Sequence, residues 1–183
     1  MLAAEQKVDF IVSLAGMVVS GAETLLAQNR IALAEAGIDA STINTYCRAL
    51  EDAFNAVAVG SGIPDIEDYD LTVALKQNYL AVLNQIQMPY MRHFIALDIR
   101  PLLGKITCPV LALNGNKDIQ VEYESNLSAL RSGLPANDGN CIEIVDGVNH
   151  LFQHCKTGAV TEYREIEETI SPAVLETIIQ WIL

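Results

Sequence analysis

The sequence predicts an α/β fold with parallel strands flanked by helices. Three short stretches with apolar residues lie within residues 7–16, 109–114 and 141–145. The first is too continuously hydrophobic for a half-exposed antiparallel strand, and the second contains an unbroken apolar run. Segments with helical spacing lie between and after them, and strands that alternate with helices form parallel sheets. The sequence therefore predicts about three parallel strands, with a long helical insertion between the first strand and the second.

The first strand and the helix after it are expected close to the N-terminus. KVDFIVSLAG, residues 7–16, is largely apolar and ends in a glycine, as a buried strand does at its turn. Residues 22–36 carry an apolar stripe at helical spacing, and Gly37 stands where a C-terminal glycine cap is expected. We expect both segments to belong to the sheet domain.

Residues 37–100 are interpreted as a helical cap inserted into a core made of residues 1–36 and 101–183. GSGIP, residues 60–64, breaks the insertion, and the prolines favour further helix starts. The helices expected in it span residues 41–58, capped by Ser41 or Thr42, then residues 70–87, then a short stretch between Pro89 and Pro101.

The remaining elements complete the core. The strand at residues 109–114 is followed by a helix near residues 122–134, and CIEIV, residues 141–145, is the third strand. Ser171-Pro172 is a strong helix start, because serine favours the cap position and proline favours the first turn. The last helix then presents one apolar face to the sheet, and Trp181 is interpreted as its packing anchor.

Composition excludes several classes of function. The net charge is −12, and no cluster of Lys and Arg marks a nucleic-acid surface. No apolar run reaches the length of about 18 residues that a membrane span needs. MLAAEQK shows no signal-peptide pattern, and a signal upstream of Met1 would be invisible, so the location stays open between cytoplasm and periplasm.

The four cysteines show neither a CxxC motif nor zinc-ligand spacing, so we expect no metal and no cofactor. Reduced thiols are the default interpretation. Cys108 and Cys141 each begin a predicted strand, and a disulfide between them is the alternative. A metal pair from His150 and His154 would need a third ligand, which the sequence does not offer.

Asp118 and His150 are the candidate catalytic residues. Each follows the end of a predicted strand, and the carboxyl ends of parallel strands are where ligands meet an open sheet. Right-handed crossover makes the two strands neighbours, so the side chains are expected within hydrogen-bonding reach. A carboxylate that orients a histidine is the acid and base pair of a nucleophilic hydrolase. Considered separately, Asp118 has the alternative interpretation of a turn or cap residue, and His150 that of a structural histidine.

PVLALNGNKDIQV, residues 109–121, followed by GVNHLFQ, residues 147–153, resembles the C-terminal half of an α/β-hydrolase. The nearest likeness is to bacterial carboxylesterases of the EstD type and to serine aminopeptidase-like hydrolases. VDFIVSLAG, residues 8–16, is similar to the sixth strand of that fold. The resemblance implies a partial α/β-hydrolase fold with a helical cap, a small-molecule ester as substrate, Asp118 as the acid of a catalytic triad and His150 as its base.

The nucleophile of that family lies on a G-x-S-x-G turn, and no such motif occurs in this sequence. Ser13, Ser20 and Ser61 each lack the glycines that the motif places two residues before and two residues after the serine. Ser20 is the best of the three, because it precedes a helix. We therefore expect a fragment of a serine carboxylic ester hydrolase that is inactive alone, from a truncated gene model, a fragment or an internal start.

A partial sheet would leave the strand at residues 8–15 unpaired on one side. A long apolar edge of this kind pairs readily with another chain, so self-association through this edge is expected. The alternative function is accordingly a non-catalytic binding or scaffold protein that pairs through the exposed edge. His93, on a helix of the cap, is interpreted as a core or surface residue. Tyr90, Met91 and Phe94 are equally consistent with an acyl-binding pocket and with core packing of the cap.

Overall fold

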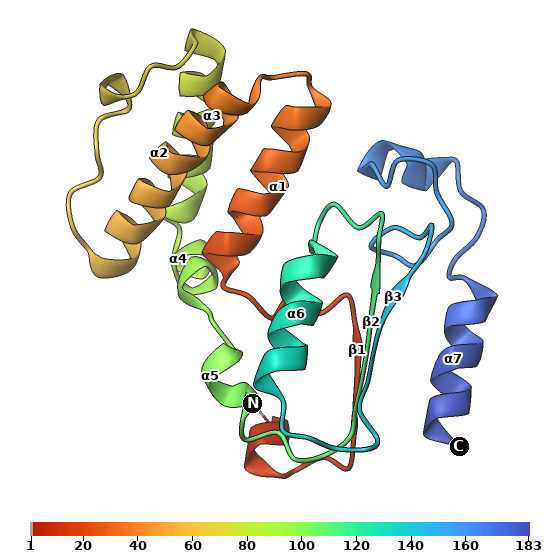
Figure 1. The fold of residues 1–183 in the computed structure, drawn as a ribbon. Helices are drawn as coiled ribbons and strands as arrows, with labels where there is room; N and C mark the ends of the chain where they lie inside the picture. The colour runs from red at the N-terminus through yellow and green to blue at the C-terminus, as the bar shows by residue number, and fades with distance from the viewer. Residues whose placement is uncertain (1) are drawn as a thin grey trace. The chain divides into compact units, whose positions relative to one another are not determined.

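The structure is a computed structural model and describes residues 2–183. Within this range the chain forms a three-stranded parallel sheet and seven α-helices, as the sequence predicts (Figure 1). It divides into two compact units. The sheet unit contains residues up to Val19 together with Asp98–Leu183, and the helical unit contains Ser20–Leu97.

The sheet has the strand order β1-β2-β3, with β1 at Ile11–Leu14, β2 at Val110–Gly115 and β3 at Cys141–Val145. Both pairings are parallel, with Leu14 opposite Leu113 and Leu113 opposite Glu143. Every residue of the central strand β2 is buried, which explains its unbroken apolar run. The second and third strands are therefore neighbours in the sheet, as the sequence predicts.

Helices cover both faces of the sheet. On one face, α6 (Tyr123–Gly133) packs Leu127 and Leu130 against Val110 and Ala112, together with the short helix α5 (Arg100–Leu103). On the other face, α7 (Pro172–Ile182) packs Val174 against Leu111 and Leu113. Figure 1 shows α6 and α7 on opposite sides of the strands. Alternate residues of β2 thus serve two separate cores.

Trp181 anchors the end of α7, as expected. Its Nε1–H donates to the Gly139 carbonyl at 3.0 Å, and its ring packs edge-on against Phe10 at 5.7 Å between centroids. Helix α7 begins at Pro172 with Ser171 in the cap position, although the Ser171 hydroxyl makes no capping hydrogen bond. The predicted start is confirmed, and proline in the first turn rather than the hydroxyl defines it.

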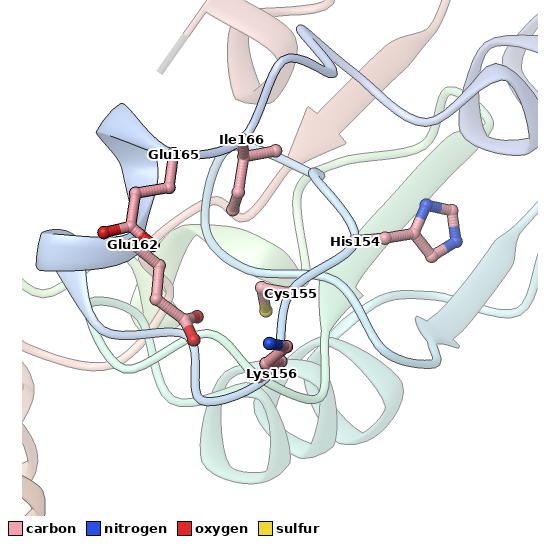
Figure 2. Close-up of a pocket in the computed structure, with 6 residues that line it drawn as sticks. All are labelled: His154, Cys155, Lys156, Glu162, Glu165 and Ile166. Atoms are coloured by element: carbon pink, nitrogen blue, oxygen red, sulfur yellow. The ribbon is translucent and has the colours of Figure 1, made fainter.

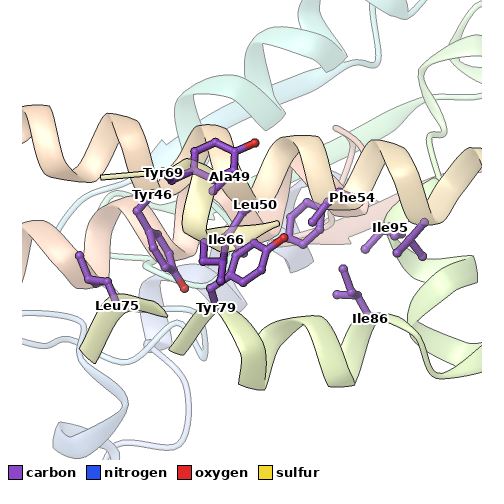
Figure 3. Packing of buried hydrophobic residues seen from close by; sticks show 12 residues of the cluster. Tyr46, Ala49, Leu50, Phe54, Ile66, Tyr69, Leu75, Tyr79, Ile86 and Ile95 are labelled. Atoms are coloured by element: carbon purple, nitrogen blue, oxygen red, sulfur yellow. The ribbon is translucent and has the colours of Figure 1, made fainter. Parts of the chain in front are cut away.

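The helical unit has a core of its own (Figure 3). Tyr46, Leu50 and Phe54 from α2 pack with Tyr79 and Ile86 from α3. The helices of this unit are α1 (Gly21–Glu35), α2 (Ala40–Val59), α3 (Val73–Ile86) and α4 (Pro89–Ala96), and short 3-10 turns lie at Leu2–Glu5 (η1), Ile66–Asp68 (η2) and Val160–Arg164 (η3) along the chain.

Two details of the helical unit differ from the sequence interpretation. The unit begins at Ser20, whereas the insertion is placed at residue 37 by the sequence. The reason is that α1 packs its apolar side, including Leu25 and Leu26, into the core formed by α2 and α3. The cap of α2 is Asp39, whose side chain accepts from Thr42 N–H; the choice of Ser41 or Thr42 is wrong by two or three residues. Gly37 ends α1 at φ 75°, as expected.

The structure also bears on the cysteines and on membrane insertion. All four cysteines are free thiols, so the alternative of a disulfide between Cys108 and Cys141 is not realised. Across residues 2–183, no helix combines the length and the apolar character that crossing a bilayer requires.

Candidate active site

The loop that carries Asp118 leaves β2 through a tight approach to the neighbouring loop. At Gly115 a β-carbon would lie 2.2 Å from the Val148 carbonyl oxygen, so only glycine fits there without a shift. The backbone N–H of Lys117 donates to that same carbonyl at 3.1 Å, and Asn116 N–H donates to Val145 O. The ends of β2 and β3 are therefore joined just before the two candidate residues.

The loop that carries His150 is organised by a buried asparagine. The Asn149 Oδ1 atom accepts from the backbone N–H groups of Leu151 and Gln153, at 2.9 and 3.0 Å. Gly147 takes the left-handed conformation, and so does the buried Phe152, at φ 59°. A phenylalanine at positive φ is unfavourable, so the surrounding contacts hold this turn in place.

Asp118 and His150 meet as the sequence predicts. His150 Nδ1 lies 2.9 Å from Asp118 Oδ2, at the carboxyl edge of the parallel sheet. The same carboxylate accepts from Gln120 N–H and Val121 N–H on Oδ1, and from Asn114 Nδ2 on Oδ2. The Asp118 side chain is fully buried, whereas 28% of the His150 side chain is exposed. The acid is thus enclosed and the base reaches solvent.

The charge of Asp118 stabilises the protonated form of His150. The hydrogen bond to Asp118 raises the pKa of His150; burial opposes the rise, and the attraction of the carboxylate adds to it. An acceptor on Nδ1 also fixes the ring tautomer, so that Nε2 carries the lone pair in the neutral form. In the sheet unit as described, Nε2 has no hydrogen-bond partner. The pair can therefore take a proton at Nε2 and hold it.

The candidate nucleophiles have other roles. Ser20 caps α1, and its hydroxyl accepts from Glu23 N–H and donates to Glu23 Oε2. Ser13 lies inside β1, and Ser61 follows the end of α2 on the surface. None of the three has glycines two residues before and two residues after it, as the G-x-S-x-G turn requires, so none has the setting of that family's serine nucleophile.

A pocket in the sheet unit is lined by residues that follow His150 in the chain, and neither Asp118 nor His150 is among the residues that line it. Its volume is about 360 Å³, and it is lined by His154, Cys155, Lys156, Glu162, Glu165 and Ile166 (Figure 2). His154 is paired with Glu168 through Nδ1 at 3.0 Å, so it does not join His150 in a metal site. Among residues 2–183, no group of three or more His, Cys, Asp or Glu is arranged to hold a metal ion.

Charge and burial in this pocket leave no strong nucleophile. Burial raises the pKa of the Cys155 thiol, which favours the unreactive protonated form. The Glu162 carboxylate accepts from the Thr157 and Gly158 N–H groups, and its pKa is lowered mainly by the Thr157 bond. The pocket therefore consists largely of groups that fold the loop after His150.

The acidic tract around Glu162 is connected to the loop that carries Asp118 by a hydrogen bond between Tyr163 and Gln120. Tyr163 accepts a hydrogen bond from Gln120 Nε2 at 2.8 Å, and Gln120 N–H in turn donates to Asp118. Burial raises the pKa of Tyr163, and the charge of Asp118 contributes to the rise. His93, by contrast, is exposed on α4, and Phe94 packs into the helical core while Tyr90 stacks on it.

Sequence reasoning missed the asparagines that hold the site. Asn114, Asn126 and Asn149 are almost fully buried. Asn126 Oδ1 accepts from Val18 N–H and Val19 N–H, which fixes the chain after β1 against α6. The available signal was a polar residue next to the end of a buried strand, for Asn114, and a polar residue on the buried face of a helix, for Asn126.

The sequence matches no protein-family model, and a search of curated proteins finds none similar to it. The geometry of the pair is thus the basis for any statement about function.

Proposed function

We propose that Asp118 and His150 are the acid and the base of a serine-type carboxylic ester hydrolase. The observation that carries the proposal is the 2.9 Å contact between His150 Nδ1 and Asp118 Oδ2 at the carboxyl edge of a parallel sheet. The unequal exposure of the two side chains supports it, because a base must reach its substrate and its orienting acid need not.

In the proposed reaction His150 Nε2 takes the proton of a serine hydroxyl as the serine oxygen attacks the ester carbonyl carbon. The tetrahedral adduct then collapses, His150 returns the proton to the leaving alkoxide, and an acyl-serine remains. Water repeats the cycle and releases the acid. Asp118 keeps the imidazole oriented and stabilises the imidazolium formed in each half-reaction.

The proposal includes a serine and oxyanion donors that residues 2–183 do not supply. The sequence contains no G-x-S-x-G motif, and Ser20, the best candidate, is occupied as a helix cap. We therefore propose that the chain of 183 residues is inactive by itself and contributes the acid and base half of the site. Loss of the nucleophile together with the oxyanion donors removes nearly all catalysis.

Hydrolysis of p-nitrophenyl acetate and butyrate tests the proposal. We expect no turnover by the 183-residue chain above the buffer blank. Ester hydrolysis by the wild-type chain that is lost in His150→Ala would overturn the proposal that the chain is inactive by itself. A chain extended by the in-frame sequence encoded upstream of Met1 is expected to contain G-x-S-x-G and to hydrolyse both esters. Absence of the motif, or activity that survives His150→Gln, would contradict the hydrolase itself.

A second candidate function is binding of another chain through the edge of β1. In the described part of the sheet β1 pairs with β2 alone, and Phe10 and Leu14 are 46% and 41% exposed. An apolar unpaired edge of this kind favours strand addition.

Analytical ultracentrifugation separates the two candidates. The binding function predicts a dimer or larger species that Leu14→Lys converts to monomer, since a charged side chain on an edge strand opposes pairing. A wild-type chain that stays monomeric at concentrations of about 100 μM contradicts it, because that result excludes self-association stronger than about 5 kcal/mol.

A further inference from the structure

Asn114 places both hydrogens of its side-chain amide next to the candidate acid. The residue is the penultimate residue of β2 and is 1% exposed. Its Nδ2 donates to Asp118 Oδ2 at 3.2 Å and to the Val121 carbonyl at 3.0 Å. Val121 N–H donates in turn to Asp118 Oδ1 at 2.9 Å, which closes a ring of hydrogen bonds around the carboxylate.

The orientation of this amide follows from the chemistry around it. Turning the amide over would place its oxygen against a carboxylate and a carbonyl, and both of these only accept. In the orientation observed, the Asn114 Oδ1 atom is buried and has no hydrogen-bond partner among residues 2–183. A buried acceptor without a partner is unfavourable, and a leucine of similar shape would avoid it. The site thus keeps two donors at the expense of stability.

The donors to the carboxylate differ in kind. Gln120 and Val121 contribute backbone N–H groups to Oδ1, whereas Asn114 contributes a side chain to Oδ2. His150 Nδ1 bonds to that same Oδ2 atom, so Asn114 and His150 share one oxygen. A donor that draws on the charge of an oxygen weakens its attraction for a second donor.

The strength of this attraction decides whether His150 is useful as a base. Asp118 raises the pKa of His150, first through the hydrogen bond and also through its charge. A general base works best when its pKa lies near the working pH, because an imidazole that is already protonated cannot accept a proton. An unshared carboxylate oxygen would push the histidine further toward the protonated form.

We propose that Asn114 is a positioning residue of the pair, which shares Asp118 Oδ2 with His150 and so limits how strongly the carboxylate favours the protonated imidazole. The idea rests on the proposed function, because it concerns how the pair serves as a base. Asn114 does not touch a substrate in this scheme and acts through Asp118.

The other titratable groups around the pair lie on the two loops and on η3. Tyr163 on η3 interacts electrostatically with Asp118 and accepts from Gln120. Lys117 is next to the acid in sequence, and its ammonium donates to the Lys156 carbonyl. Cys155 interacts with both Lys117 and Tyr163. The variants below leave all of these groups unchanged, so a change in His150 reports on the hydrogen bond of Asn114.

The test is an NMR titration of the His150 ring in the wild-type chain and in Asn114→Leu, with His150→Gln used to assign the signal. Loss of the amide donor is expected to raise the His150 pKa by about half a unit. Asp118→Asn, which removes the charge, is expected to move it in the opposite direction. An unchanged or lowered pKa in Asn114→Leu would overturn the proposal.

A measurement on the wild-type chain covers the case in which Asn114→Leu does not fold. The side-chain amide protons of Asn114 are expected to exchange slowly with solvent and to shift with the same midpoint as the His150 ring. The proposal would be contradicted if the Asn114 amide protons exchanged with solvent as fast as those of the exposed Asn55. It would also be contradicted if their chemical shifts did not change with pH at the midpoint of the His150 titration. Neither measurement uses an ester, so a chain without esterase partners still gives an answer on Asn114.

Discussion

The loop that carries Asp118, called here the acid loop, and the loop that carries His150, called the base loop, are built differently, although one hydrogen bond joins them. The acid loop encloses its functional side chain: Gly115 lies against the Val148 carbonyl, and Asp118 is buried under four donors, three of which come from residues 114–121. In the base loop the Asn149 side chain accepts from the loop's own backbone, and His150 is left partly exposed. The difference separates a group that only holds a charge from a group that must exchange protons.

The largest effect is expected where the two loops touch. Gly115→Ala places a methyl group 2.2 Å from a backbone oxygen, and backbone cannot move aside as a side chain can. We expect a loss of about 3 kcal/mol in the free energy of unfolding, measured by urea denaturation. Gly104→Ala is the matched control, because a β-carbon there meets nothing within 4 Å. Equal stability of the two variants would show that the backbone at Gly115 and Val148 can move apart without a measurable loss of stability.

An intermediate effect is expected inside the base loop. Asn149→Ala leaves the backbone N–H groups of Leu151 and Gln153 without their acceptor, which costs about 2 kcal/mol. Asn55→Ala on the exposed side of α2 is the control and should stay within about 0.5 kcal/mol of the wild type. If Asn149→Ala is as stable as the control, the base loop is held by its neighbours and the contrast between the loops disappears.

The smallest effect concerns the bond that joins the loops. The hydrogen bond to Asp118 raises the pKa of folded His150 above its ordinary value of 6.5, so the folded state binds this proton more tightly than the unfolded state. The resulting stability is fully present below the unfolded pKa and is lost as the pH rises through the folded pKa. Wild type should therefore exceed His150→Gln in stability by more at about pH 5.5 than at about pH 9. His93→Gln controls for the removal of an exposed imidazole. A stability difference that is the same at both values of pH would mean that the bond does not favour the protonated ring.

The sequence predicts much of the sheet and little of what holds the site. The apolar run of β2 followed by Gly115 predicts a buried strand and a sharp exit, and Asp118 and His150 follow from strand ends. The spacing of apolar residues does not say which neighbour a helix packs against, so the sequence does not reveal that α1 packs into the core of the helical unit. The role of Asn114 depends on an amide orientation set by Asp118 and Val121, which no local pattern contains.

Cap positions show the same limit on a smaller scale. Asp39, Ser41 and Thr42 all suit the start of α2, and local propensity alone does not choose among them. The choice falls on Asp39 because its carboxylate reaches Thr42 N–H while its own backbone is still extended.

The position of Trp181 makes the two units separable by spectroscopy. It is the one tryptophan of the sequence, and it lies in the sheet unit between Phe10 and the Gly139 carbonyl. Its emission therefore follows the melting of the sheet unit, while far-ultraviolet circular dichroism is weighted toward α1, α2 and α3 in the helical unit. Two optical signals recorded in a single thermal scan thus follow the two cores separately, without any added label.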